Sequence, residues 1–116
     1  MVLLNRINND TVLFSLNGHI GKHNGIHADY LTMKVAGVMP LPGHVRVLRK
    51  VITDLRLEGH AICGTPDRGY FIANNETELL ETCNFLYDRA MSSITIIARM
   101  RGVSLPDLKG QLRLPT

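Results

Sequence analysis

The strongest restriction on the fold comes from the segment PGHVRVLRKVITDLRLEG, residues 42–59. Its apolar residues recur every three or four positions, which is the spacing of one face of an α-helix. Pro42 suits the first turn of a helix, and Gly59 suits its end. We therefore predict a helix over residues 42–58 whose apolar side lies on a core and whose opposite side faces solvent. The predicted core residues are Val45, Leu48, Val51, Ile52 and Leu55, and the opposite face carries Arg46, Lys50 and Thr53.

Two shorter helices are predicted before this one. Asp10 suits the N-cap of the first, which ends between residues 17 and 23. Asn24-Gly25 indicates a turn, because both residues tolerate a positive φ. The second helix covers residues 26–37, with Gly37 as its C-cap. The predicted apolar faces consist of Val12, Leu13, Leu16 and Ile20 in the first helix and Ile26, Tyr30, Leu31, Val35 and Val38 in the second.

A β-hairpin and a long helix are predicted after residue 59. Residues 60–63 and 70–73 are apolar and β-prone, and residues 64–69 between them are rich in turn formers. Asn75 and Glu78 have the spacing of a capping box, and Gly102 follows a helix predicted over residues 76–101. The fold class expected is α+β and mostly α: three helices, a hairpin and a long C-terminal helix.

The last helix carries an apolar seam with alternating spacings of three and four residues, as in a coiled coil. A helix over residues 76–101 is roughly 39 Å long at 1.5 Å per residue, which exceeds what so small a core can cover. The seam therefore either covers the three-helix core or, as we favour, pairs with a second copy of the chain. We expect a domain at 1–75, a dimerisation helix at 76–102 and a tail at 103–116. The seam residues are Leu80, Cys83, Tyr87, Ala90, Ile94 and Ile97.

Composition excludes few classes of function. The chain has 116 residues and a formal net charge of +3, which permits nucleic-acid binding without requiring it. Two cysteines, Cys63 and Cys83, are too few for a disulfide framework, and the N-terminus lacks the apolar run of a signal peptide. No segment is long and apolar enough to cross a membrane. We expect a cytoplasmic protein.

Catalytic and metal-binding patterns are not apparent. His19, His23 and His27 are spaced four apart, but Gly21 and Asn24-Gly25 interrupt any helix that would bring them to one face. His60 and Cys63 have no second pair at metal-ligand spacing. No catalytic triad or phosphate-binding glycine loop is recognisable. We expect neither an enzyme nor a cofactor.

The run from the third helix into the hairpin carries a resemblance to a known family. Residues 45–56, the following Leu57-Glu58-Gly59-His60-Ala61-Ile62 and the later Gly69-Tyr70-Phe71-Ile72 are similar to winged helix-turn-helix domains. These are the DNA-binding domains of bacterial regulators such as the biotin operon repressor. The part from the hairpin to the long helix resembles small phage-encoded winged-helix proteins more loosely. The sequence departs from the family pattern at residues 38–43, an apolar turn with two prolines where a Ser/Thr-containing turn is usual.

The resemblance implies that helix 42–58 enters the major groove of DNA and that hairpin 61–73 is the wing. Arg46 is the best candidate for a bidentate contact to guanine, and Arg49 is placed for a phosphate. Arg68 lies at the tip of the wing. The full set of expected DNA-binding residues is Arg46, Lys50, Arg49, Thr53, His44, Lys34 and Arg68.

The function expected is sequence-specific binding of double-stranded DNA by a homodimer. Transcription regulation and a phage replication or recombination accessory role both fit this expectation. The alternative is a protein–protein interaction module built on the same scaffold, in which a host or phage protein is the partner. The apolar turn at residues 38–43 and the modest net charge favour the alternative.

Overall fold

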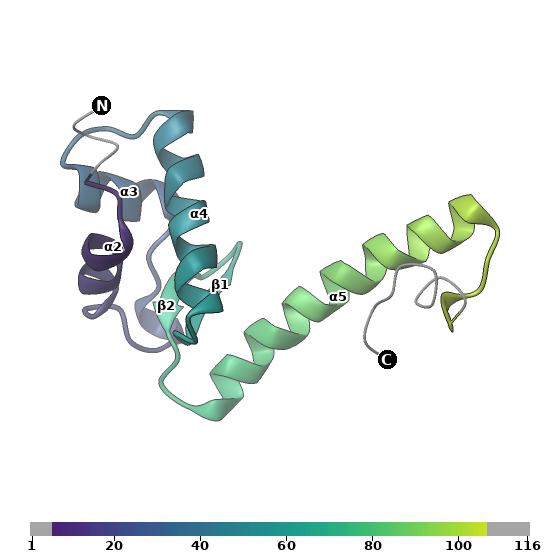
Figure 1. Ribbon diagram of the computed structural model, residues 1–116. Coiled ribbons are helices and arrows are strands. Elements are labelled where there is room, and N and C mark those ends of the chain that lie inside the picture. Colours follow the sequence, from purple (N-terminus) through teal and green to yellow (C-terminus); the bar gives the residue numbers. More distant parts are fainter. Residues whose placement is uncertain (1–5, 107–116) are drawn as a thin grey trace. The chain divides into compact units, whose positions relative to one another are not determined.

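A computed structural model describes residues 6–106 of the chain (Figure 1). The fold is α+β and mostly helical, as predicted, with one antiparallel hairpin and a long helix at the C-terminal end. The chain divides into two compact units, Met1–Thr82 and Cys83–Thr116, and the first turns of the long helix belong to the first unit. Residues 107–116, most of the predicted tail, lie outside the described residues. The elements in order are α2 (Asn9–Leu16), the 3-10 turn η1 (Lys22–Asn24), α3 (Ala28–Ala36), α4 (Pro42–Leu57), β1 (Ile62–Thr65), β2 (Gly69–Ile72) and α5 (Glu76–Arg101).

The core of the first unit forms where α2, α3 and α4 meet. Helix α4 begins at Pro42, as predicted, and buries Leu48, Val51, Ile52 and Leu55. Val45, a predicted core residue, is only partly buried. His44 is buried, although the sequence pattern did not predict it in the core. The residues supplied by α2 and α3 are Val12, Leu16, Leu31 and Ala36.

The start of α2 differs from the prediction. Asn8, and not Asp10, is the N-cap: its Oδ1 accepts from the Thr11 amide at 3.0 Å. Thr11 Oγ1 accepts from the Asn8 amide at 3.1 Å in return, so the two residues form a capping box. Asp10 instead lies in the first turn, where a carboxylate still complements the positive helix end. Gly37 ends α3 in the left-handed conformation with φ 79°, as predicted.

The hairpin loop is shorter than predicted. Thr65 pairs with Gly69, so residues 66–68 alone form the loop, whereas residues 64–69 were expected to. Glycine and threonine favour turns as isolated residues, but here Gly64 and Thr65 are held in the ladder by pairing with β2. Gly69 begins β2 with φ 76°, a conformation that only glycine adopts without strain.

The chain before α3 adds an edge to the hairpin that the sequence pattern did not predict. The Gly21 amide donates to Ile72 O at 2.9 Å, and the Ile26 and Tyr70 amides donate to each other's carbonyl oxygens at 2.8 Å. Ile20, predicted on the buried face of the first helix, is therefore outside α2 and forms a parallel bridge with Ile72. These bonds join residues 20–26, which we call the edge segment, to β2 and so hold the hairpin on the three-helix core.

The start of α5 is tied to the same edge through Glu78, which is 7% exposed. Asn75 Oδ1 accepts from the Glu78 amide at 2.9 Å, which is one of the two bonds of the predicted capping box. The Glu78 carboxylate accepts from two other amides, those of Asn74 at 2.9 Å and Lys22 at 3.1 Å. The Asn74 and Lys22 amide bonds hold the pKa of Glu78 below its usual value, since they favour the charged carboxylate.

Substitution of Gly25 tests the packing of the edge segment against the hairpin. A Cβ at this position would overlap the Arg68 carbonyl oxygen, so we expect Gly25→Ala to push the edge segment away from the hairpin. Overpacking of this kind costs about 1–3 kcal/mol of stability, to be measured by denaturant unfolding. Gly43→Ala is the matched control, because nothing lies within 4 Å of its added Cβ. Equal stability of the two variants would contradict the described edge.

Glu78 gives a prediction about pH. Its lowered folded-state pKa means that the carboxylate stabilises the fold above its unfolded pKa and loses this effect as the pH falls through the folded pKa. Glu78→Gln removes the charge, so we expect it to unfold at a lower temperature than wild type at pH 7. The gap should narrow and then close as the pH falls through the lowered folded-state pKa of Glu78, below the ordinary range of a glutamate carboxyl. Thermal unfolding followed by circular dichroism from pH 7 into acid checks this, and a gap of constant size across the range would contradict it.

Candidate nucleic-acid interface

The solvent face of α4 presents two unengaged arginines. Because Leu48, Ile52 and Leu55 point into the core, the side chains about 180° away around the helix are directed to solvent. Arg46 and Arg49 are exposed, and within the described residues neither guanidinium makes a hydrogen bond or an ion pair. Both are therefore available to an anionic or hydrogen-bonding ligand.

Lys50 and Thr53 share this face but are less free. Lys50 Nζ lies 3.2 Å from Asp54 Oδ2, one turn along the helix, and both side chains are largely exposed to solvent. Such surface pairs contribute under about 1 kcal/mol, so a phosphate can still compete for Lys50. Thr53 Oγ1 donates to Arg49 O at 3.1 Å and keeps lone pairs for another partner.

His44 does not belong to this exposed face, contrary to expectation. It is buried, and its Nδ1 accepts from the Leu41 amide at 3.2 Å. The His44 amide donates to Leu41 O at 2.9 Å, so the residue closes the first turn of α4. The prediction failed because helical angle alone does not reveal that a turn with two prolines folds back over the start of the helix.

Lys34 is exposed, but its side chain is engaged by neighbouring segments of the chain. Its Nζ donates to Ser15 O at 3.4 Å and lies 3.1 Å from His19 Nε2. His19 Nδ1 lies 2.7 Å from Asn24 O, which fits a tautomer that donates there and accepts from Lys34. Lys34 thus links α3 to the end of α2, and a contact to DNA would have to displace these bonds.

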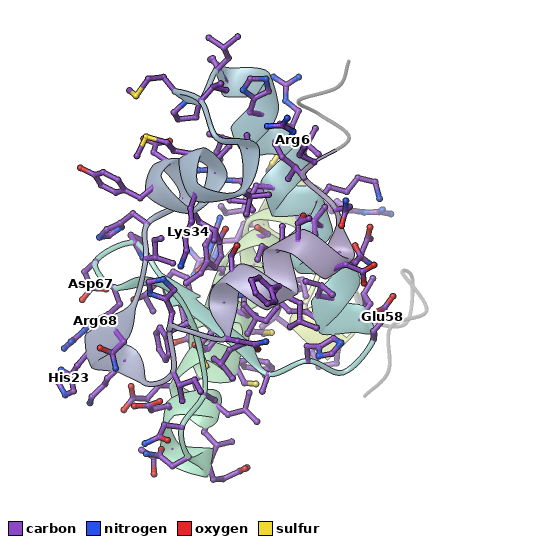
Figure 2. All side chains as sticks on the ribbon, turned by 90° about the vertical axis from the view of Figure 1, so that its left-hand side faces the viewer. Arg6, His23, Lys34, Glu58, Asp67 and Arg68 are labelled. Carbon is purple, nitrogen blue, oxygen red and sulfur yellow. The ribbon has the colours of Figure 1, made fainter. Side chains whose placement is uncertain are left out.

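Arg68 lies at the tip of the hairpin, with Asp67 beside it. The Arg68 Nε–Asp67 Oδ2 distance of 3.9 Å is a weak pairing. The Thr65 hydroxyl donates to Asp67 at 2.6 Å, and this bond holds the pKa of Asp67 below its usual value. Figure 2 places Asp67 and Arg68 together at one side of that view, near His23, with Glu58 on the opposite side. The tip is therefore of mixed charge.

Arg56 joins the hairpin to α4, a role that the sequence did not suggest. Its Nε donates to Ile62 O at 2.8 Å, and its guanidinium lies 5.9 Å from the Tyr70 ring centroid. One side chain thus contacts both strands from the last turn of α4. Together with the Asn9 Nδ2 bond to Glu58 Oε1 at 3.4 Å in the connecting turn, this contact holds the hairpin at the end of α4.

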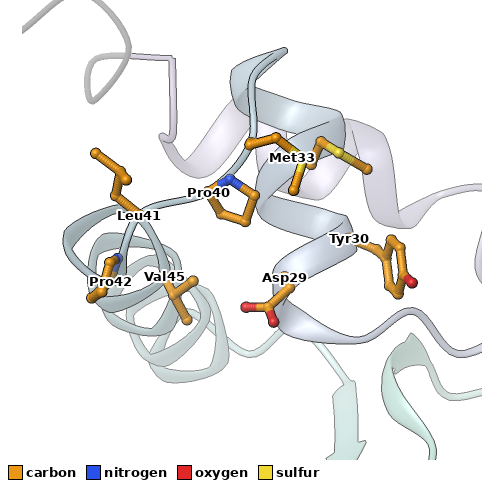
Figure 3. A pocket seen from close by; sticks show the side chains of 8 residues that line it. Asp29, Tyr30, Met33, Pro40, Leu41, Pro42 and Val45 are labelled. Carbon is orange, nitrogen blue, oxygen red and sulfur yellow. The ribbon is translucent and has the colours of Figure 1, made fainter.

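A groove of about 480 Å³ lies between α3 and α4 (Figure 3). We call it the apolar groove. Met39 and Leu41 on its rim are 75% and 63% exposed. Figure 3 shows Asp29, its one charged residue, facing Val45 across the space between the two helices. The complete lining is Asp29, Tyr30, Met33, Met39, Pro40, Leu41, Pro42 and Val45.

Within the first unit, the start of α5 packs through residues that lie outside the predicted seam. Within the first unit, α5 buries Glu78 and Thr82, and Thr82 Oγ1 accepts from the Gly64 amide at 3.4 Å. Leu80, the first seam residue, is 50% exposed. Its side chain lies on the other side of the helix from those two, given 100° per residue. Of the remaining seam residues, Cys83, Tyr87, Ala90 and Ile97 are exposed and Ile94 is partly buried.

Among residues 6–106, no three histidine, cysteine or acidic side chains gather closely enough to hold a metal ion. Across the same residues no helix is long and apolar enough to span a bilayer. No protein-family model matches the chain, and no curated protein or solved structure is significantly similar to it.

Proposed function

We propose that the chain binds double-stranded DNA as a winged helix-turn-helix protein, with α4 in the major groove and β1–β2 as the wing. The unengaged Arg46 and Arg49 on the solvent face of α4 are the observation that carries the proposal. The order of α2, an edge segment, α3, α4 and a hairpin supports it, since the edge segment pairs with β2 beside the helices. Transcription regulation and replication or recombination of a phage both suit such a protein.

The two arginines have different tasks in this proposal. Arg46 lies opposite the buried stripe, where the helix comes closest to the floor of the groove, and its planar guanidinium can donate two bonds to guanine. Arg49 lies nearer the flank, where a DNA backbone passes, and suits a phosphate. Lys50 and Thr53 extend the same surface toward the C-terminal end of α4.

Substitution of each arginine should therefore give a different result. Arg46→Gln should weaken binding to the preferred duplex by about 1–3 kcal/mol and relax the choice of one base pair. Arg49→Gln should weaken binding to all duplexes alike and reduce the slope of log K against log salt by about 1. Fluorescence anisotropy with a selected duplex, at several salt concentrations, measures both.

Arg99→Gln is the matched control, because Arg99 is an exposed arginine of α5 whose side chain makes no bond within the described residues. Its loss changes the net charge equally. If all three variants lost the same affinity, binding would reflect net charge and not the face of α4. If Arg46→Gln bound as wild type does, the groove assignment would be wrong.

Pairing of α5 with a second copy is the other part of the proposal. The seam supplies the apolar residues that a coiled-coil interface needs, and its first residue, Leu80, is not among the α5 residues buried within the first unit. A dimer with two-fold symmetry would present two copies of α4 to a palindromic or repeated DNA site.

Disruption of the seam should give monomers. Tyr87→Glu introduces a charge on a 61% exposed seam residue, and we expect light scattering to change from a dimeric to a monomeric mass. Ser92→Glu is the control, because this exposed residue lies on the face of α5 away from the seam. Cys83 is exposed and Cys63 is buried, so mild oxidation should cross-link a parallel dimer through Cys83. A monomeric wild-type chain would contradict dimerisation.

The apolar groove favours a second candidate function, a protein–protein interaction module. Monomeric proteins seldom expose side chains like Met39 and Leu41 beside each other without a partner. A stable complex with a protein, combined with no salt-dependent binding to any duplex, would select this alternative.

A further inference from the structure

The apolar groove and Arg46 belong to the same end of α4. Pro42, Val45, Arg46 and Arg49 occupy adjoining angles around the first two turns of the helix. Leu41 precedes them at the N-cap and is 63% exposed. In the proposed function this end enters the major groove, so these apolar side chains meet DNA together with Arg46.

The chemistry of this end is unsuited to the DNA backbone. Phosphate oxygens need cations or hydrogen-bond donors, and the lining of the apolar groove has one charged residue, Asp29, which would repel them. The Asp29 carboxylate makes no ion pair within the described residues, so no cation neutralises it there. A carboxylate can instead accept from the amino group of a base.

Base edges in the major groove offer one bulky apolar group, the C5 methyl of thymine. Contact with an apolar side chain at the end of the helix removes this methyl from water and so stabilises the complex. Cytosine and uracil lack the methyl and therefore lack this contribution. An exposed apolar side chain such as Leu41 therefore gains a partner that a duplex provides at defined positions.

We propose that Leu41 and Val45 select thymine, by contact with its C5 methyl, next to the base pair that Arg46 reads. The inference rests on the proposed function, since it names the bases that the same site prefers. It assigns a role in base selection to the turn at residues 38–41, where winged helix-turn-helix domains usually have hydrogen-bonding residues.

Replacement of thymine by uracil tests the proposal, because it deletes the methyl and leaves base pairing unchanged. A duplex selected from a random library by the full-length protein is synthesised with single uracil substitutions. We expect at least one substitution to weaken wild-type binding about fourfold, the effect of one buried methyl-sized group. Leu41→Ala should discriminate less than wild type between the thymine and uracil duplexes, since Val45 alone remains to contact the methyl.

Two further variants make the result specific. Val45→Thr keeps the shape of the side chain and should also reduce the discrimination against uracil, since a hydroxyl replaces a methyl. Arg46→Gln should bind more weakly but still prefer thymine. Thermal unfolding of each variant shows that the fold is retained.

The possible failures are distinguishable. Selective binding by wild type without sensitivity to uracil overturns the thymine inference and leaves the proposed function standing. Failure of wild type to select any duplex overturns both, and points to a protein as the partner of the apolar groove. Equal sensitivity to uracil in wild type and Leu41→Ala removes Leu41 from the contact and overturns the assignment.

Discussion

Burial of the apolar stripe of α4 is the interaction on which the rest of the structure depends. Leu48, Ile52 and Leu55 are almost completely removed from water, and each contributes roughly 1.5–3 kcal/mol by the transfer of its side chain. The burial also determines which face of α4 is turned to solvent. A helix that inserts three such residues into the core of α2 and α3 must turn its opposite face to solvent, and that face bears Arg46 and Arg49.

The hairpin is coupled to this helix by polar contacts of defined geometry. Arg56 reaches the Ile62 carbonyl from α4, and the edge segment pairs with Ile72 and Tyr70 from the other side. A two-stranded hairpin alone is only marginally stable in water. The added edge and the Arg56 contact explain how so short a hairpin keeps a fixed position beside α4. In a DNA-binding protein this position decides whether the wing and the helix can contact one duplex together.

The sequence predicted the elements well and the side-chain surroundings less well. Helix α4 was predictable from Pro42 to its last turn because apolar periodicity, an N-terminal proline and a following glycine all agree. The hairpin loop was predicted too long, because Gly64 and Thr65 favour turns locally while their pairing partners in β2 are not visible to local rules. The edge segment and the Glu78 contact to the Lys22 amide join residues far apart in the chain, which no periodicity reveals.

In the candidate site, too, features set by helical periodicity were predictable and features set by neighbouring segments were not. Exposure of Arg46 followed from helical angle, whereas the burial of His44 and the engagement of Lys34 with Ser15 depended on the path of neighbouring segments. These two corrections reduce the number of free cations on the proposed interface. With fewer phosphate contacts, the sequence-independent part of the affinity for DNA is weaker, and the affinity depends less on salt.

In the proposed function, the small charge on the solvent face of α4 determines where sequence selectivity must come from. With few phosphate contacts, the affinity of one copy must come largely from base edges, where a good bidentate contact contributes about 1–3 kcal/mol. Such an amount is too small for a single α4 to distinguish its site among the many competing sites of a genome. Two linked copies add their base contacts, and the second binds at a raised effective concentration without any new kind of interaction. In the proposed function, the exposed apolar seam of α5 and the sparse charge of α4 therefore fit together, because a helix that bound weakly alone would be selective only if a second copy accompanied it.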